Sequence, residues 1–220
     1  MRYYTSHGPV HVSTQMTGKM AGIDTLSTSC LCNRICSKRG QNENSVCHFC
    51  FAKRTIRCHS KNLAPLLEEN YRILNKGLLK KWESEVIRFN SALGRIESFG
   101  DVDSVMMAMN YIRIVRGNPQ TKFGVWTKNP GYWSEAIRIL GKPRNLSVVY
   151  SSVLLNRPAN PETVKRVFPF VDHIFTVYTK EYAKEHPELE INCGALHCAS
   201  CQRCYRQSRK KIDVVSEALK

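Results

Sequence analysis

Apolar residues recur at helical spacing over a long stretch in the first half of the chain. Ser60 can cap a helix there, and Pro65 falls in its first turns. The apolar positions have the period of one amphipathic helix, and Gly94 follows them as a stop. They are Leu63, Leu67, Tyr71, Leu74, Leu78, Trp82, Val86 and Phe89. We therefore expect one long helix from Ser60 to Phe89.

Strand-like and helix-like patterns then alternate along the chain. Each strand pattern ends at small or polar residues, and each helix pattern is bounded by cap or stop residues such as Asp103, Gly117 and Gly141. Asp103 is expected to cap the first of these helices. We expect strands at 95–99, 122–127, 146–152 and 173–178, helices at 104–116, 131–140, 161–167 and 180–186, and a short N-terminal strand at 10–14.

Alternating strands and helices at this spacing predict right-handed βαβ units and a parallel sheet. The fold class is therefore α/β, either a partial (β/α) barrel or an open parallel sheet. Four strong strands and an N-terminal one are too few for a full eight-fold barrel. We expect residues 1–190 to form this unit, with residues 191–220 as a C-terminal cysteine-rich metal-binding segment.

Small and polar residues follow the predicted strands. In parallel α/β folds the chemistry lies at the carboxyl ends of the strands, so these residues should share one rim. They include Ser98, Gly100, Asp101, Ser151 and Ser152.

Nine of the ten cysteines fall into two clusters. The first spans residues 30–50, a polar segment with little apolar material for a core of its own. Thiolates on a metal are the natural way to hold such a segment together. A secreted disulfide scaffold is the alternative, but a chain whose first residues contain no apolar signal segment points to a reducing compartment. The first cluster contains Cys30, Cys32, Cys36, Cys47 and Cys50, and the second contains Cys193, Cys198, Cys201 and Cys204.

The C-terminal cluster has the spacing C-x4-C-x2-C-x2-C. Zinc sites more often present separated C-x2-C pairs, whereas a consecutive C-x2-C-x2-C run is typical of iron–sulfur loops. An iron–sulfur cluster on Cys193, Cys198, Cys201 and Cys204 is therefore favoured, and zinc is the alternative.

The N-terminal cluster has no such regular spacing. Four of its thiols would close a tetrahedral zinc site, whereas three on a cubane would leave one iron open to a substrate or cofactor. The spacing alone does not decide whether Cys30 or Cys32 is a ligand.

Charge points to a polyanionic partner. The chain has 33 Lys and Arg residues against 18 Asp and Glu residues, for a net charge of +15. A basic balance of this size favours nucleic acid, with a solubilising surface or cations that moderate an anionic cluster as alternatives. Because net charge carries no information on sequence readout, it identifies no specific target. The basic residues that flank the cysteines are Arg34, Lys38, Arg39, Lys53, Arg54, Arg57, Lys61, Arg203, Arg206, Arg209, Lys210 and Lys211.

Several segments together resemble a known family. They are T-S-C-L-C-N-R-I-C, C-H-F-C-F-A, E-S-F-G-D, F-G-V-W-T-K, N-L-S-V-V-Y-S-S and C-G-A-L-H-C-A-S-C-Q-R-C-Y. Their order over residues 15–206 resembles the phage and plasmid gene product eighty-eight family. That family is itself similar to the radical S-adenosylmethionine enzymes, which use a partial (β/α) barrel and a cubane held by three cysteines after the first strand.

The resemblance implies roles for individual residues. It assigns the cubane to Cys36, Cys47 and Cys50, with Phe49 in the usual aromatic position before the last cysteine. Cys36 and Cys47 are ten residues apart, whereas the superfamily motif is C-x3-C-x2-C. The cofactor S-adenosylmethionine would lie near the strand ends, with its amino group at Gly100 and Asp101 beside Ser98, and its ribose at Ser151 or Ser152.

Two functions follow as expectations. The first is an iron–sulfur enzyme of the radical S-adenosylmethionine type with one or two [4Fe–4S] clusters, acting on nucleic acid or a nucleotide. The second is a basic nucleic-acid-binding module without chemistry, held by two cysteine-ligated metal sites. A metal-dependent nuclease is disfavoured because no carboxylate cluster is evident. We expect the protein in the cytoplasm, that of the host cell if it is phage-encoded.

Overall fold

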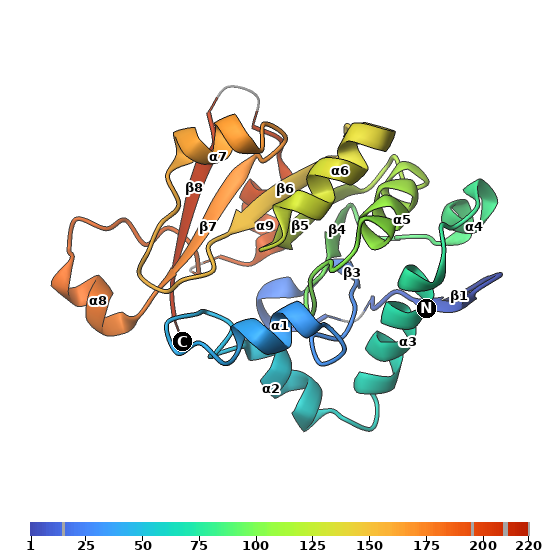
Figure 1. Cartoon of the computed structure of the whole chain (residues 1–220), viewed down its shortest axis with the longest axis horizontal. Coiled ribbons are helices and arrows are strands. Elements are labelled where there is room, and N and C mark those ends of the chain that lie inside the picture. Colours follow the sequence, from blue (N-terminus) through green and yellow to red (C-terminus); the bar gives the residue numbers. More distant parts are fainter. Residues whose placement is uncertain (15, 195, 209–210, 220) are drawn as a thin grey trace.

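The computed structural model describes residues 1–14, 16–194, 196–208 and 211–219 of the 220-residue chain. In this part of the chain a six-stranded parallel sheet forms the centre of the molecule, with strand order β3-β4-β5-β6-β7-β8 (Figure 1). Each strand pairs with its successor in the chain, which confirms the predicted α/β class with a parallel sheet. The strands are β3 (Asp24–Leu26), β4 (Leu93–Ile96), β5 (Lys122–Thr127), β6 (Leu146–Ser151), β7 (His173–Tyr178) and β8 (Asp213–Ala218).

Helices lie between successive strands of this sheet, and several of them lie between β3 and β4. A separate antiparallel hairpin of β1 (Arg2–Thr5) and β2 (Gly8–His11) lies at the N-terminus. Two 3₁₀ turns, η1 (Gly18–Met20) and η2 (Arg203–Tyr205), complete the described elements. The α-helices are α1 (Arg34–Arg39), α2 (Phe51–Cys58), α3 (Ala64–Lys76), α4 (Lys81–Val86), α5 (Val105–Arg116), α6 (Pro130–Leu140), α7 (Pro161–Val167), α8 (Lys180–Glu185) and α9 (Cys198–Cys201).

The two faces of the sheet are covered differently. Phe123 and Val125 of β5 belong to the main core, together with Tyr111 of α5 and Trp133 of α6, whose rings stack with centroids 6.2 Å apart. Because successive side chains of a strand point to opposite faces, Trp126 lies on the other face, and it packs there with Tyr205 of η2. The C-terminal cysteine segment therefore covers the face opposite α5 and α6.

The prediction of one long helix from Ser60 to Phe89 is wrong. The chain forms α2 before this stretch and divides it into α3 and α4. The side chain of buried Asn110 explains the break, because its Nδ2 donates to the carbonyls of Leu74 (2.9 Å) and Gly77 (2.8 Å) and its Oδ1 accepts from the N–H of Leu79 (2.8 Å). These bonds satisfy the end of α3 without a further turn. Trp82, expected on the buried stripe, is 53% exposed as a result.

Three smaller expectations also need correction. The helix α5 is capped by Ser104, whose hydroxyl accepts from Met107 N–H at 3.1 Å, whereas Asp103 accepts a hydrogen bond from the Tyr71 hydroxyl. The N-terminal strand expected at 10–14 is β2 of the hairpin and lies outside the main sheet. The first and last strands of the sheet, β3 and β8, were not predicted, because β3 has only three residues and half of the residues of β8 are polar.

The strand β8 belongs to the C-terminal segment predicted as residues 191–220. It pairs in parallel with β7 over six residue pairs, from His173 with Asp213 to Tyr178 with Ala218. The cysteine-rich segment that precedes β8 is thereby part of the connection between two paired strands of one sheet. None of the helices in the described residues has the length and hydrophobicity needed to cross a membrane.

Candidate metal centres

The N-terminal cysteines lie in the loop that follows β3, the first strand of the parallel sheet. Hydrogen bonds to the next strand fix the start of this loop, because Thr28 donates through its N–H (3.0 Å) and hydroxyl (2.8 Å) to the carboxylate of Glu97. The N–H of Cys30 donates to the carbonyl of Phe99 at 3.2 Å. The cysteine loop is therefore anchored to the carboxyl end of β4.

Two short helices carry the remaining cysteines of this loop. Asn33 caps α1, accepting from the N–H groups of Ile35 (2.9 Å) and Cys36 (3.0 Å), and donates to the carbonyl of Asp101 at 2.8 Å. The sulfur of Cys50 accepts from Lys53 N–H at 3.4 Å and so caps α2. Both caps fix sulfur-bearing residues at the ends of helices.

Four thiols gather in this loop: those of Cys30, Cys36, Cys47 and Cys50. Cys30, Cys36 and Cys50 share a small apolar cluster with Ile56. A hydrogen bond from the Cys30 thiol lowers the pKa of Cys50 to about 6 and raises that of Cys30. Burial raises the pKa of Cys36, and the nearby charges of Asp101, Cys47 and Cys50 raise it further. The structure thus brings Cys30 to the three cysteines assigned by the sequence.

Cys32 lies apart from these thiols. Its pKa is raised by burial and then by the charge of Glu68, a residue of α3, and Asp103 adds to the effect. The charges that act on this thiol thus come from Glu68 and Asp103, whereas those that act on Cys36 include the other cysteines. Cys58, at the end of α2, is exposed.

The C-terminal cysteines surround the turn between α9 and η2. Gln202 adopts a left-handed conformation (φ 55°) there, which lets the chain reverse between Cys201 and Cys204. Cys193 lies alongside β8, because its N–H donates to the carbonyl of Ser216 at 3.0 Å. Burial raises the pKa of Cys204 to about 12, and the charges of Cys193, Cys198 and Cys201 contribute to the increase. All four predicted C-terminal ligands are therefore neighbours.

Cations lie beside the C-terminal thiols. Lys19 donates from Nζ to the sulfur of Cys193 (3.1 Å) and to the Glu217 carboxylate (2.7 Å). The guanidinium of Arg95 lies 3.3 Å from the ring centroid of Trp126, and its charge lowers the pKa values of Cys198 and Cys204 against the effect of burial. Neither cation was predicted, since Lys19 is 174 residues from Cys193 and no local pattern links them.

The donor sets suit soft metals. Thiolate ligands select zinc and iron–sulfur clusters over oxygen-preferring cations such as magnesium or calcium, and all ten cysteines are free thiols. Among the described residues, no group of three or more His, Cys, Asp or Glu side chains has the arrangement that a bound metal ion needs. The thiols are thus gathered by the fold without being in ligating positions.

The residues assigned to the cofactor lie at the strand ends, as expected, but most are engaged with protein. Asp101 is buried, and its carboxylate accepts from Val102 N–H (2.8 Å), the Thr127 hydroxyl (2.7 Å) and Lys128 N–H (2.7 Å). Gly100 is packed so tightly that an added Cβ would lie 2.5 Å from the Thr28 hydroxyl. Asp101 therefore joins the end of β5 to the turn after β4, and Gly100 lets that turn pack against the start of the cysteine loop.

The serines and the phenylalanine differ from one another. Ser151 and Ser152 are buried, and the Ser152 hydroxyl lies 3.3 Å from that of Thr176. The Ser98 hydroxyl is buried with no hydrogen-bond partner in the described part of the chain. Phe49 is 50% exposed. Of these residues, Ser98 has the clearest unmet need for a ligand.

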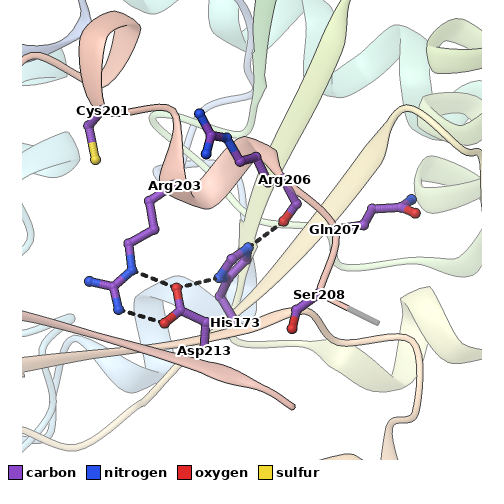
Figure 2. A pocket seen from close by; sticks show the side chains of 7 residues that line it. All are labelled: His173, Cys201, Arg203, Arg206, Gln207, Ser208 and Asp213. Atoms are coloured by element: carbon purple, nitrogen blue, oxygen red, sulfur yellow. Dashed lines mark hydrogen bonds and ion pairs between the residues drawn. The ribbon is translucent and has the colours of Figure 1, made fainter. Parts of the chain in front are cut away.

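A cavity of about 510 Å³ adjoins the C-terminal cysteines at the start of β7 and β8 (Figure 2). Arg203 binds the Asp213 carboxylate through two hydrogen bonds of 2.6 and 2.5 Å. His173 lies between two acceptors, with Nδ1 3.1 Å from Asp213 and Nε2 2.7 Å from the carbonyl of Arg206. Both contacts are hydrogen bonds only if the ring carries two protons. This network fastens the cysteine segment to the sheet.

Comparisons with known proteins give one match. The family model described as Gene product 88 matches residues 11–216, which is most of the chain. Neither the curated proteins nor the solved structures gave a match.

Proposed function

The chain belongs to the Gene product 88 family, and we propose that it is an iron–sulfur protein that binds nucleic acid. In this proposal each of the two groups of four thiols holds one cluster on a scaffold of the radical S-adenosylmethionine type. The gathering of Cys30 with Cys36, Cys47 and Cys50 after β3 is the observation that carries it.

The order of the strands supports this scaffold. A parallel sheet in which every strand pairs with its successor has the strand order of a (β/α) barrel, whereas doubly wound sheets reverse their order part-way. The N-terminal cysteine loop follows the first strand of this sheet, which is where the superfamily places its cubane. The described strands do not pair β3 with β8, which is compatible with the proposed partial barrel and with an open sheet.

The surroundings of the thiols suit an anionic cluster. Lys19 and Arg95 place two cations beside the C-terminal group, and Lys128 places one beside Cys36 and Cys50. Hydrogen bonds and positive charges near sulfur ligands set the reduction potential of such clusters. The bound clusters would stabilise the fold or carry electrons.

The module is favoured over the enzyme by two features of the N-terminal site. An enzyme of the superfamily type needs one iron without a protein ligand, and the nearness of Cys30 to Cys36 and Cys50 favours a fourth thiolate ligand instead. It also needs a carboxylate for the cofactor's amino group, and both oxygens of Asp101 already accept hydrogen bonds. One observation favours the enzyme: the buried Ser98 hydroxyl at the end of β4 lacks a partner among the described residues.

The nucleic-acid part of the proposal is supported by charge. The net charge of +15 is concentrated around both cysteine groups. Arg34, Lys38, Arg54 and Arg57 are exposed on α1 and α2, and Arg206 is exposed beside the C-terminal group. Arg209 and Lys210, which were grouped with Arg206 in the sequence, lie outside the described residues.

Anaerobic purification tests the cluster proposal. We expect iron and sulfide in a ratio near one, for two clusters per chain, and a visible absorption that bleaches with dithionite. A colourless protein with stoichiometric zinc, and no iron after anaerobic reconstitution, would contradict it.

Titration with S-adenosylmethionine separates the module from the enzyme. Electron paramagnetic resonance of the reduced protein should not change in the module, and no 5′-deoxyadenosine should form. A changed spectrum together with deoxyadenosine would establish the enzyme instead.

A further inference from the structure

Exposed aromatic rings and cations share one surface of the N-terminal cysteine loop. Phe51, Arg54 and Arg57 are exposed on α2, whereas Ala52 and Ile56 on its opposite side are buried. Residues three apart are neighbours on a helix surface, so the ring and the two guanidinium groups form one stripe. Phe49, in the turn just before α2, is also exposed.

The two phenylalanines are unusual for a surface. Phe49 is 50% exposed and Phe51 is 61% exposed. One face of the Phe51 ring is held by Phe99, with centroids 6.2 Å apart and planes 24° apart. The ring of Phe49 is held edge-on by His48 at 5.0 Å. Rings fixed by their neighbours in this way offer preformed apolar platforms to a ligand.

Helix α1 adds further positive charge beside α2. Arg34 and Lys38 are exposed and one helical turn apart. Cys36 of α1 and Cys50 at the start of α2 pack in the same small cluster, so the two helices lie side by side (Figure 1). Residues 31–61 contain seven Lys and Arg residues and one acidic residue, Glu43. In the described residues, no carboxylate forms an ion pair with Arg34, Lys38, Arg54 or Arg57.

We propose that this aromatic–basic face, formed by Phe49, Phe51, Arg34, Lys38, Arg54 and Arg57, binds single-stranded nucleic acid. The faces of the bases are free to stack on protein side chains only where a strand is unpaired. Proteins commonly bind such single strands with aromatic side chains flanked by cations. The bases stack on Phe51 and Phe49 while the cations contact phosphates. The proposal rests on the nucleic-acid part of the proposed function and specifies the form of the ligand.

Fluorescence anisotropy with a labelled oligothymidine tests this assignment. Phe51→Ala should weaken binding of the single strand about tenfold, since loss of one stacked base has an effect of this size. Phe51→Trp should restore it. A hairpin duplex of the same total charge should bind Phe51→Ala and the wild type alike. Trp82→Ala is the matched control, because Trp82 is 53% exposed on α4 and belongs to another surface.

The cations should behave differently from the rings. Replacement of Arg54 and Arg57 together by glutamine should weaken binding of both probes. It should also reduce the slope of log affinity against log salt by roughly 1.5, as expected when two phosphate contacts are lost. Phe51→Ala should leave that slope unchanged. Iron content and circular dichroism of each variant confirm that the cysteine loop is intact.

Three results would overturn the assignment, and they differ in what else they affect. Full single-strand affinity in Phe51→Ala would reject stacking and leave nucleic-acid binding in place. No binding of either probe by an iron-replete wild type would reject the nucleic-acid part of the proposed function as well, and leave the cluster part. A wild-type dimer that Phe51→Ala converts to a monomer, detected by light scattering, would identify the face as a contact between two copies of the chain.

Discussion

The two groups of cysteines are held in place by different parts of the structure. The C-terminal thiols lie against the central sheet, where Tyr205 and Trp126 pack and Lys19 and Arg95 supply positive charge. The N-terminal thiols lie in a loop with a small cluster of their own, and two of them, Cys30 and Cys50, share a hydrogen bond. The positive charge of Arg95 opposes the rise in pKa that burial imposes on Cys198 and Cys204, whereas at the N-terminal group the hydrogen bond between Cys30 and Cys50 lowers the pKa of one thiol and raises that of the other.

The C-terminal group therefore packs directly on the central sheet, whereas the N-terminal group lies in a loop that packs mainly on itself. The segment from Cys193 to Cys204 lies in the connection between the paired strands β7 and β8, and Cys193 forms a bridge with Glu217 of β8. The N-terminal loop is attached at two places outside the sheet strands. Thr28, Cys30 and Asn33 hydrogen-bond to the end of β4 and the turn after it, and the backbone of residues 44–46 pairs with residues 153–155 after β6. Loss of a ligand should therefore have unequal consequences in the two regions.

The largest effect expected is that of removing a C-terminal ligand. Cys204→Ala should lose one cluster and lower the free energy of unfolding by roughly 5 kcal/mol or more, because metal binding at a structural thiol site is itself folding free energy. For a chain of this size the midpoint of thermal unfolding should fall by roughly 10 °C or more.

The matched variant in the other region is Cys47→Ala. It should also lose one cluster but lower the unfolding midpoint less, because its loop bonds to the connections after β4 and β6, whereas the C-terminal group packs on a face of the sheet. Iron analysis and differential scanning calorimetry under anaerobic conditions measure both effects. Equal destabilisation by the two variants would break the comparison.

The next effect concerns the choice between two cysteines in the N-terminal loop. Cys30→Ser should reduce the iron content by the amount of the N-terminal cluster or convert its spectrum, because Cys30 lies with Cys36 and Cys50. Cys32→Ser should leave iron content and spectrum unchanged, since Cys32 does not belong to the cluster formed by Cys30, Cys36 and Cys50. If Cys30→Ser retains an unaltered cluster, three cysteines hold it and one iron is open.

The smallest of these effects concerns the anchor of the N-terminal loop. Burial raises the pKa of Glu97 to about 7, although hydrogen bonds from Tyr111 and Thr28 lower it. The folded state therefore retains a proton that the unfolded state has released above pH 4.5. This contribution to stability is complete below about pH 4.5 and is lost as the pH rises to about 7, with a total of about 3 kcal/mol.

Glu97→Gln should remove that loss, because the amide does not titrate. The free energy of unfolding of the variant should depend less on pH than that of the wild type, between pH 5 and pH 8, in urea titrations. Tyr111→Phe removes a hydrogen-bond donor to Glu97 without removing the carboxyl and is a suitable control, since its pH dependence should remain. A variant Glu97→Gln with the wild-type pH profile would place the titration elsewhere.

Much of the fold could be predicted because its strands and helices have strong local patterns. The strand β5 and the helix α7 with its Asn160 cap agree with expectation at nearly every residue. The division of the long helix depended on Asn110, more than thirty residues away, which no local pattern reveals. Likewise β3 and β8 are defined by their neighbours in the sheet rather than by their own hydrophobicity.

The candidate sites were predictable in a similar way. The spacing of cysteines is local, and the thiols of Cys36, Cys47 and Cys50 are gathered as the sequence indicated. The position of Cys30, rather than Cys32, near the other thiols depends on a hydrogen bond from the Cys30 N–H to the carbonyl of Phe99, which lies in the connection after β4. The hydrogen bonds that Thr127 and Lys128 donate to the Asp101 carboxylate also join residues that are far apart in the sequence. Contacts between distant segments decided each of these points.

The pairing of β8 with β7 has a consequence for how the chain reaches its native state. The partners His173 and Asp213 are 40 residues apart, so this strand can dock only after a long connection has closed. Contacts of such separation are made late and slowly, because the entropy of loop closure must be overcome first. The strands from β4 to β7, whose pairings join residues closer in sequence, can therefore assemble first, on the ribosome as the chain emerges. Until β8 arrives, β7 presents an open edge that could pair with another nascent chain.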